Sequence, residues 1–205
     1  RRQMNALTLT AISSINNAVR RELYLENANI ISEEVFVATL DGRTSAVCRG
    51  LDGRRYEVGD GPIPPLHFRC RSTRAAVFNG SVLGNRPAVP AVERILVRDY
   101  AARNKLDGLF RRRDDLPRGH KTRFDDFKRT EIGKRVGRVP AERTYAEWLR
   151  EQSVEFQDAI LGRAKGRLFR DGGLKLDKFV GSMSKELTLE QLAKLHAQNF
   201  IKAGL

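Results

Sequence analysis

The stretch from residue 41 to residue 71 constrains this chain more than any other. It contains both cysteines of the protein, Cys48 and Cys70, and one of its three histidines, His67. A rigid Pro-Pro pair leads into the histidine. Core filling alone does not explain why the metal-competent and redox-competent side chains gather within about thirty residues. We therefore expect the most distinctive part of the fold to be built here.

Three interpretations of Cys48, His67 and Cys70 remain open at this point. Two residues separate His67 from Cys70, so both side chains can reach one metal ion, and zinc prefers such ligands. Zinc usually takes a fourth ligand, for which Asp41 or Asp52 is the nearest acceptable donor. Alternatively, the two cysteines form a disulfide on exposure to oxidant. In the third interpretation they stay reduced and buried beside a hydrogen-bonded histidine.

Net charge is the strongest global signal. The 205 residues include 38 Lys and Arg against 25 Asp and Glu, a net charge of +13. Such an excess favours contact with a polyanion, although it is also compatible with a basic surface that is only solvated. Two cysteines and no signal-peptide pattern indicate synthesis in a reducing compartment. No apolar run approaches the roughly 20 residues that span a bilayer, so no membrane segment is expected.

Hydrophobic periodicity predicts a helix followed by a small sheet in the first eighty residues. The helix runs to about residue 24, and its apolar positions recur at three- to five-residue steps. They are Leu7, Ile12, Ile15, Val19 and Leu23. Segments 35–40, 55–58 and 71–78 have the composition of β-strands. Because the chain opens within the helical pattern, we expect it to be a piece of a longer protein.

The remaining chain predicts a linker, a basic arm and a helical end. Residues 79–90 are rich in Gly, Asn and Pro, and a helix is expected from Pro90. Residues 111–138 are the most basic and least periodic stretch, which favours an extended arm or surface loop. Capping boxes at Thr144 and Thr188 predict helix starts. The fold class is thus α+β: an N-terminal helix packed on a small antiparallel sheet with a Cys/His loop cluster, then an extended basic arm and a small helical C-terminal unit. The corresponding regions are 1–80, 81–143 and 144–205.

The basic stretch is the candidate DNA-binding surface. Only two aromatics, Phe124 and Phe127, interrupt it, whereas single-strand binders use many interleaved aromatics for stacking. We therefore expect phosphate contacts to double-stranded DNA without base reading. The alternative is a solvated surface or an interface with acidic proteins. The candidate residues are Arg111, Arg112, Arg113, Arg118, Lys121, Arg123, Lys128, Arg129, Lys134, Arg135 and Arg138.

Catalytic motifs are absent from the sequence. It contains no zinc-deaminase signature, H-E-x-x-H, Walker A, G-x-S-x-G or dinucleotide fingerprint. His120 and His196 lie in unrelated contexts. We therefore expect no enzymatic activity. The alternative is a metal-dependent nuclease or effector with His67 as base and Asp41 on a metal, together with the cysteines.

Polar residues around the turns are expected to be structural. Asp41 can accept hydrogen bonds from turn amides and pair with a nearby arginine. The residues assigned to this structural motif are Asp41, Arg43, Thr44, Asp52, Pro64, Pro65 and Arg71.

The chain resembles the phage head morphogenesis family, typified by the Mu F protein and the minor head protein of a Bacillus siphophage. The residues that carry the resemblance are Val37-Ala-Thr-Leu-Asp-Gly-Arg-Thr44, Cys48, Asp52-Gly53, Pro64-Pro-Leu-His67 and Cys70-Arg-Ser-Thr73. The match covers about residues 1–78, and the C-terminal segment looks like the tail of many minor head proteins. Many members carry Cys-x-x-Cys and Cys-Arg-Cys, whereas this chain has one cysteine at each place.

The resemblance implies a structural minor head protein of a tailed phage. Such a protein associates with the portal protein, and an interaction with the major capsid protein is also implied. It touches packaged DNA and acts in head assembly and in DNA packaging or ejection. Its location is the portal-proximal head of the virion, and the host cytoplasm during assembly. The basic charge agrees with these expectations.

Overall fold

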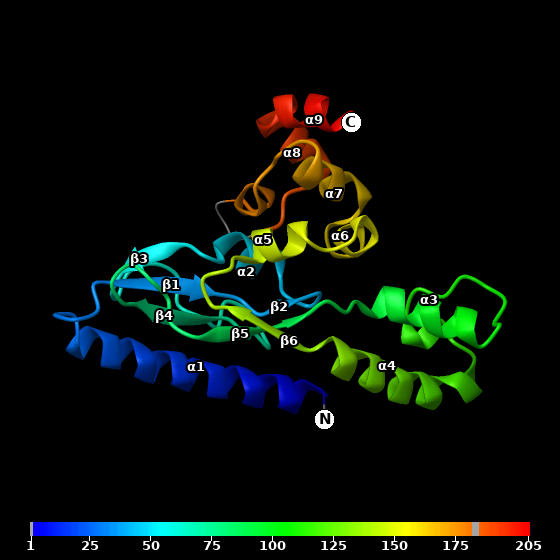
Figure 1. Cartoon of the computed structure of the whole chain (residues 1–205), viewed down its shortest axis with the longest axis horizontal. Helices are drawn as coiled ribbons and strands as arrows, with labels where there is room; N and C mark the ends of the chain where they lie inside the picture. The colour runs from blue at the N-terminus through cyan, green and yellow to red at the C-terminus, as the bar shows by residue number, and fades with distance from the viewer. Residues whose placement is uncertain (1, 182–184) are drawn as a thin grey trace.

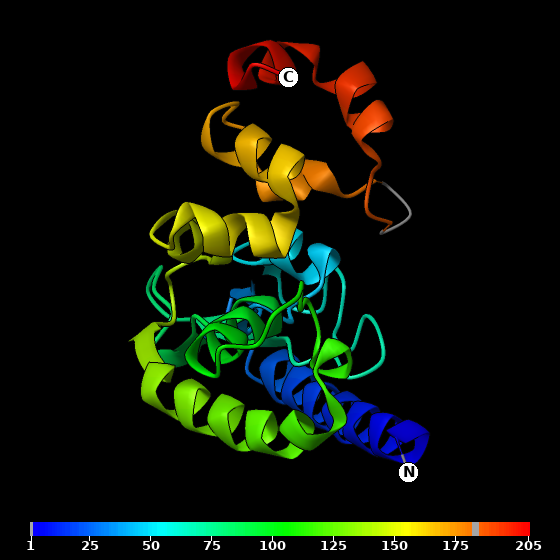
Figure 2. The ribbon, with the colours of Figure 1, turned by 90° about the vertical axis from the view of Figure 1, so that its right-hand side faces the viewer.

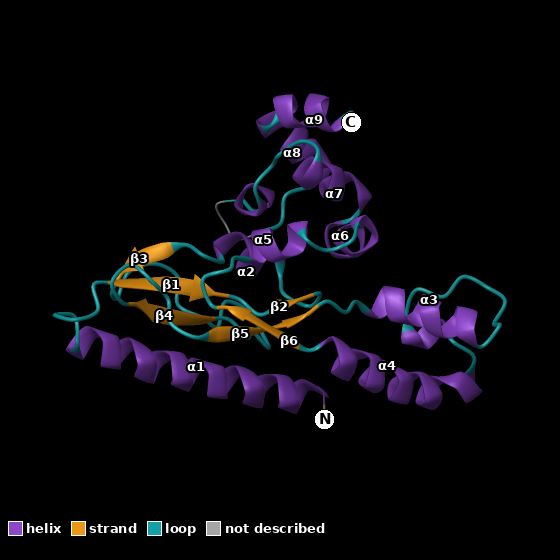
Figure 3. Cartoon of the chain, viewed as in Figure 1, coloured by secondary structure: helices purple, strands orange, loops and turns teal. Residues whose placement is uncertain are grey.

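An antiparallel three-stranded sheet forms the N-terminal part of the fold in the computed structural model, which describes residues 2–181 and 185–205 (Figure 3). Strand β1 (Glu33–Val37) lies between β3 (Arg55–Glu57) and β4 (Thr73–Val77). The register places Glu34 opposite Tyr56 on one side and Ala76 on the other. The predicted small antiparallel sheet is confirmed.

A second sheet joins segments that are far apart in the sequence. Strand β5 (Asn85–Val89) pairs in parallel with β2 (Leu40–Asp41) and antiparallel with β6 (Gly137–Pro140). The prediction of a linker over 79–90 is therefore wrong for residues 85–89. Burial alternates along this strand, with Arg86 and Ala88 facing inward. Its two pairing partners are distant in the chain, so local composition gave no sign of the strand.

Helix α1 (Arg2–Glu26) packs along the first sheet, but not with the face that the sequence suggested. Its polar residues face the protein: Asn17 is buried, and Arg20 Nη1 donates to Thr73 Oγ1 at 2.6 Å. The apolar residues Ile15 and Val19 are more than 60% exposed. The helix is confirmed and runs along the sheet (Figure 1), but the exposure of its apolar residues shows that they face away from the sheet. No helix among the described residues is long and apolar enough to cross a membrane.

The segment expected as an extended basic arm is instead folded into a helical hairpin. Helices α3 (Glu93–Arg103) and α4 (Lys121–Arg135) pack together, joined through the 3-10 turns η1 (Arg113–Asp115) and η2 (Arg118–His120). Their core contains Leu96, Tyr100 and the fully buried Phe124. Tyr100 meets the rings of Phe124 and Phe127 at centroid distances of 5.5 and 5.4 Å. The two aromatics therefore pack the hairpin, which the high charge of the segment had obscured.

The C-terminal third is a helical unit, as predicted. Its elements are α5 (Tyr145–Arg150), α6 (Val154–Leu161), α7 (Arg163–Arg170), η3 (Leu176–Phe179), α8 (Leu189–Leu195) and α9 (Ala197–Ala203). Both predicted capping boxes form, with Thr144 and Glu147 in one and Thr188 and Gln191 in the other. The core of this unit also includes Leu40 of the second sheet. The helices therefore stack on the side of the sheets opposite α1 (Figure 2).

Candidate metal centre and the polar contacts that hold it

Cys48, His67 and Cys70 converge, as the sequence predicts. Cys48 lies on the short helix α2 (Ala46–Leu51), whose start is capped by Ser45 Oγ accepting from the Cys48 amide at 3.3 Å. The Sγ atoms of Cys48 and Cys70 are 3.7 Å apart, and Cys48 Sγ lies 3.3 Å from His67 Nε2. One ligand atom from each residue lies within 4.8 Å of the other two. This group could hold a metal ion.

The imidazole of His67 is oriented by a backbone contact. Its Nδ1 lies 2.9 Å from the carbonyl oxygen of Phe68. A carbonyl only accepts, so this hydrogen bond places the proton on Nδ1 and leaves the lone pair of Nε2 free to accept or to bind a cation. Nε2 faces Cys48 and lies 2.9 Å from Ser45 Oγ. The nitrogen directed at the two thiols is therefore in the form that a metal requires.

The pKa values of the two thiols are shifted in opposite directions. Their mutual hydrogen bond, reinforced by burial, raises the pKa of Cys48. The same hydrogen bond lowers the pKa of Cys70 to about 5, because a thiol donor stabilises the neighbouring thiolate. A bound cation would favour the thiolate form of both cysteines. Both cysteines are free in this structure, so they do not form the disulfide that the second interpretation requires.

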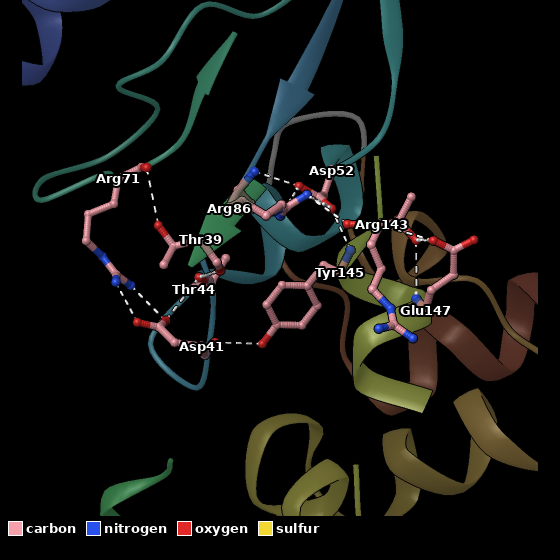
Figure 4. Close-up of polar contacts among 11 residues, drawn as sticks. Thr39, Asp41, Thr44, Asp52, Arg71, Arg86, Arg143, Tyr145 and Glu147 are labelled. Carbon is pink, nitrogen blue, oxygen red and sulfur yellow. Dashed lines mark hydrogen bonds and ion pairs between the residues drawn. The ribbon is translucent and has the colours of Figure 1, made fainter. Parts of the chain in front are cut away.

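Asp41 does not join the Cys/His group, which corrects its assignment as a tentative metal ligand. Arg71 donates to both of its carboxylate oxygens, at 2.5 and 2.8 Å (Figure 4). The amide of Arg43 donates to Asp41 Oδ1 at 2.9 Å, and Thr44 Oγ1 lies 3.2 Å from the same atom. Arginine and turn donors already surround this carboxylate, which is directed at them and not at the Cys/His group.

The Asp41 carboxylate is held in its ionised form. Burial opposes ionisation, but the hydrogen bonds and charges of Arg71 and Arg43 outweigh that effect and lower the pKa of Asp41. The same residue also connects to the C-terminal unit, because the hydroxyl of Tyr145 donates to the Asp41 carbonyl at 2.8 Å. Tyr145 is fully buried. The turn after β2 is thereby tied both to the Cys/His loop and to α5.

Asp52 forms a second junction, and its side chain is fully buried beside Arg86. Its oxygens accept from the amides of Ala38 and Tyr145, both at 2.5 Å, and from Arg86 Nη2 at 2.7 Å (Figure 4). Burial raises the pKa of Asp52, while Arg86 and the two amides oppose that shift. The Arg86 guanidinium also donates to the carbonyls of Ala38 and Arg143. These contacts occupy Asp52, so it is not the fourth metal ligand either.

A second fully buried ion pair, besides Asp52–Arg86, holds the Gly- and Pro-rich loop. Glu34 on β1 and Arg74 on β4 lie 3.3 Å apart, and each side chain is only 4% exposed. Glu34 accepts from the Gly59 amide at 3.1 Å, and Arg74 donates to the Asp60 carbonyl at 3.0 Å. The Pro64–Pro65 peptide bond that follows is cis.

Sequence reasoning missed three of these residues: Glu34, Arg74 and Arg86. For the Glu34–Arg74 pair, the available signals were a charged residue inside the predicted strand 71–78 and another directly before the predicted strand 35–40. Arg86 lay in a predicted linker and offered none, because its strand is defined only by distant pairing partners.

Of the eleven candidate DNA-binding residues, five form ion pairs with described residues, five exposed ones form none, and the partly buried Lys121 donates to the Asp114 carbonyl. Several are neutralised inside the hairpin: Arg113 donates to Asp125 at 2.6 Å, and Glu131 meets Lys134 at 3.0 Å and Arg135 at 3.4 Å. Within the described part of the chain, five exposed members form no ion pair. These five are Arg111, Arg112, Arg118, Arg123 and Arg138. They are the members best placed to meet phosphates.

Comparisons of the chain with models of protein families, with curated proteins and with solved structures find no match. The resemblance to the phage head morphogenesis family thus rests on the motif residues themselves.

Proposed function

We propose that this protein is a structural component of a tailed-phage head, one that associates with the portal and contacts packaged DNA. The observation that carries the proposal is how the motif residues are used. Asp41 accepts hydrogen bonds from Arg71, and Asp52 accepts from the Tyr145 amide and from Arg86, so all three motif residues form contacts inside the chain. Residues used in this way position a loop rather than react with a substrate, which suits an assembly protein better than an enzyme.

The alternative, a metal-dependent nuclease or effector, needs Asp41 on the metal. The two hydrogen bonds from Arg71 to that carboxylate argue against such a role. A nuclease of this kind should cleave plasmid DNA when Mg²⁺, Mn²⁺ or Zn²⁺ is added. The structural role predicts that the plasmid stays intact under the same conditions.

The metal that suits the Cys/His group best is zinc. Two sulfur ligands and one imidazole nitrogen form a donor set that zinc prefers and that Mg²⁺ or Ca²⁺ does not. When bound, zinc would supply a positive charge that stabilises both thiolates. Cys48, His67 and Cys70 would hold it and so fix the loop to α2. We expect this metal to be structural.

DNA binding is expected at the unpaired arginines. Each cation that meets a phosphate contributes about 0.9 to the slope of log K against log salt. Replacing Arg111 and Arg112 by Gln should therefore lower the slope by up to about two units. The matched control is Arg113→Gln, whose charge is already opposed by Asp125, so its slope should change less. Filter binding to random duplex at several salt concentrations measures both.

Two results would count against this proposal. The first is absence of DNA binding at about 50 mM salt, which would leave only a protein–protein role for the basic surface. The second is absence of the protein from purified phage heads that contain the portal ring, which would refute the virion role. Mass spectrometry of purified heads, with the portal protein as the internal standard, tests the latter.

A further inference from the structure

The outer face of α1 is an apolar surface that no described part of this chain covers. Ile12, Ile15, Val19 and Leu23 follow one another at three- and four-residue steps, and each is more than half exposed. With 3.6 residues per turn, they lie on the side of the helix opposite Asn17, which faces the sheet. Monomeric proteins rarely expose such a continuous stripe, so it marks a docking surface.

A groove runs beside this stripe. It has a volume of about 780 Å³, and its walls include Leu9 and Ile12 of α1 and Phe68 of the Cys/His loop. The loop is attached to the helix by the Arg69 amide, which donates to Thr10 Oγ1 at 2.9 Å. Arg43 lines the groove with a side chain that is 81% exposed. An apolar helix with acidic side chains fits this combination.

Helix α1 itself has that composition. Glu22 and Glu26 lie within one turn of Val19 and Leu23 at its C-terminal end, and Glu22 is 67% exposed. We propose that α1 pairs antiparallel with α1 of a second copy of this chain, the two helices crossing near Ile15. Glu22 lies seven positions after Ile15, and Thr8 lies seven positions before it. Glu22 of one copy therefore lies level with Thr8 of the other, next to the groove that Leu9 and Arg43 line. Within one copy Glu22 pairs with Arg21, and the exposed Arg43 side chain pairs with Asp41, so the pair between copies would add to these contacts.

Charge favours this arrangement over the other occupants. In a parallel pair, Glu22 and Glu26 would face their own counterparts and repel, whereas antiparallel helices also align their dipoles favourably. Helices that bind membrane surfaces carry Lys and Arg beside the apolar face. Here Arg20 lies on the side that contacts Thr73, and the charged residues that α1 itself carries next to the stripe, Glu22 and Glu26, are acidic. The basic side chains, Arg43 among them, lie in the groove, where they can meet acidic side chains of a second copy. A second copy thus fits better than an anionic lipid surface or DNA.

Sedimentation equilibrium of the chain, freed of nucleic acid, tests the pairing. We expect a mass approaching twice 23.2 kDa as the concentration rises from about 1 to 100 µM. Ile15→Asp and Val19→Asp should each raise the dissociation constant at least about 100-fold, because an ion would enter the apolar contact. Both side chains are exposed, so the melting temperature of the dissociated protein should not change. The control Leu109→Asp removes an exposed apolar side chain remote from α1 and should leave the constant unchanged.

A double-mutant cycle tests the orientation. Glu22→Gln and Arg43→Gln should each weaken association about three- to tenfold, and the double variant should lose no more than either single variant if the two groups pair. A chain that stays monomeric at 100 µM overturns the proposal. So does a dimer that is unaffected by Ile15→Asp. Additive effects of Glu22→Gln and Arg43→Gln overturn the antiparallel orientation. None of these results depends on DNA binding or on the presence of the protein in phage heads.

Discussion

The N-terminal sheets and the C-terminal helices are stabilised by different interactions. In the sheets, the ion pairs Glu34–Arg74 and Asp52–Arg86 are almost fully buried, and the apolar cluster around Cys48 is small. In the C-terminal unit, a large apolar core includes Leu168 and Phe169, both fully buried. Directional polar contacts fix loop positions, whereas an apolar core depends mainly on volume. The stability of the loop region should therefore depend on charge, pH and bound metal. The stability of the helical unit should depend on how well its core side chains pack.

The largest expected effect is from Asp52→Ala. The change leaves the Arg86 guanidinium buried without its carboxylate and removes the acceptor for the Ala38 and Tyr145 amides. We expect a loss of about 3–5 kcal/mol in the free energy of unfolding, measured by urea denaturation. The control is Asp177→Ala, which breaks a partly exposed pair with Arg54 and should cost less than about 1 kcal/mol. Equal losses would show that the buried pair is not what stabilises the region.

A cavity in the helical unit should have a comparable but pH-independent effect. Leu168→Ala removes a fully buried side chain and should cost about 2–5 kcal/mol in the same denaturation experiment. Because no charge is involved, the loss should be similar at pH 7 and pH 4. A strong pH dependence of this loss would mean that the two regions do not differ as described.

Metal removal should affect the loop region and spare the helical unit. A ligand at about 100 times its dissociation constant stabilises the folded state by about 2.7 kcal/mol, so a chelator should remove about that much. Amides of residues 46–51 and 67–72 should then exchange hydrogen faster, and those of 189–203 should not. His67→Ala should abolish the effect of the chelator, because it removes one of three ligands. Metal analysis that finds no zinc in the purified wild-type chain would contradict this prediction.

The smallest expected effect concerns the Asp41–Arg71 pair. In the folded state the pKa of Asp41 is lower than its ordinary value of 3.8. The ionised carboxylate therefore contributes fully to the free energy of unfolding above that pH. This contribution is lost as the pH falls through the lower, folded pKa. We expect the Asp41–Arg71 pair to contribute about 1.5 kcal/mol to the free energy of unfolding at pH 7, as a hydrogen bond to a charged group does. The stability of Asp41→Asn should therefore fall less than that of the wild type between pH 5 and pH 2. Parallel stability curves for the two proteins would refute this expectation.

Local patterns in the sequence determined the elements that depend on local interactions. The capping boxes at Thr144 and Thr188 marked helix starts because each places a hydroxyl and a side-chain acceptor three residues apart. The two-residue spacer between His67 and Cys70 indicated a shared centre, which the structure forms together with Cys48. The α+β class and the three strands of the first sheet also followed from composition and turn residues.

Tertiary structure alone decided which partners these elements found. Strand β5 forms because β2 and β6 reach it from distant segments, and α4 is stabilised by packing on α3. The apolar stripe of α1 was visible in the sequence, but which side of the helix would face the sheet was not, because Asn17 and Arg20 form polar contacts with β4. Likewise Asp41 and Asp52 had the chemistry of metal ligands. Only their burial beside Arg71 and Arg86 made them structural, since a carboxylate with arginine partners has few lone pairs left for a cation.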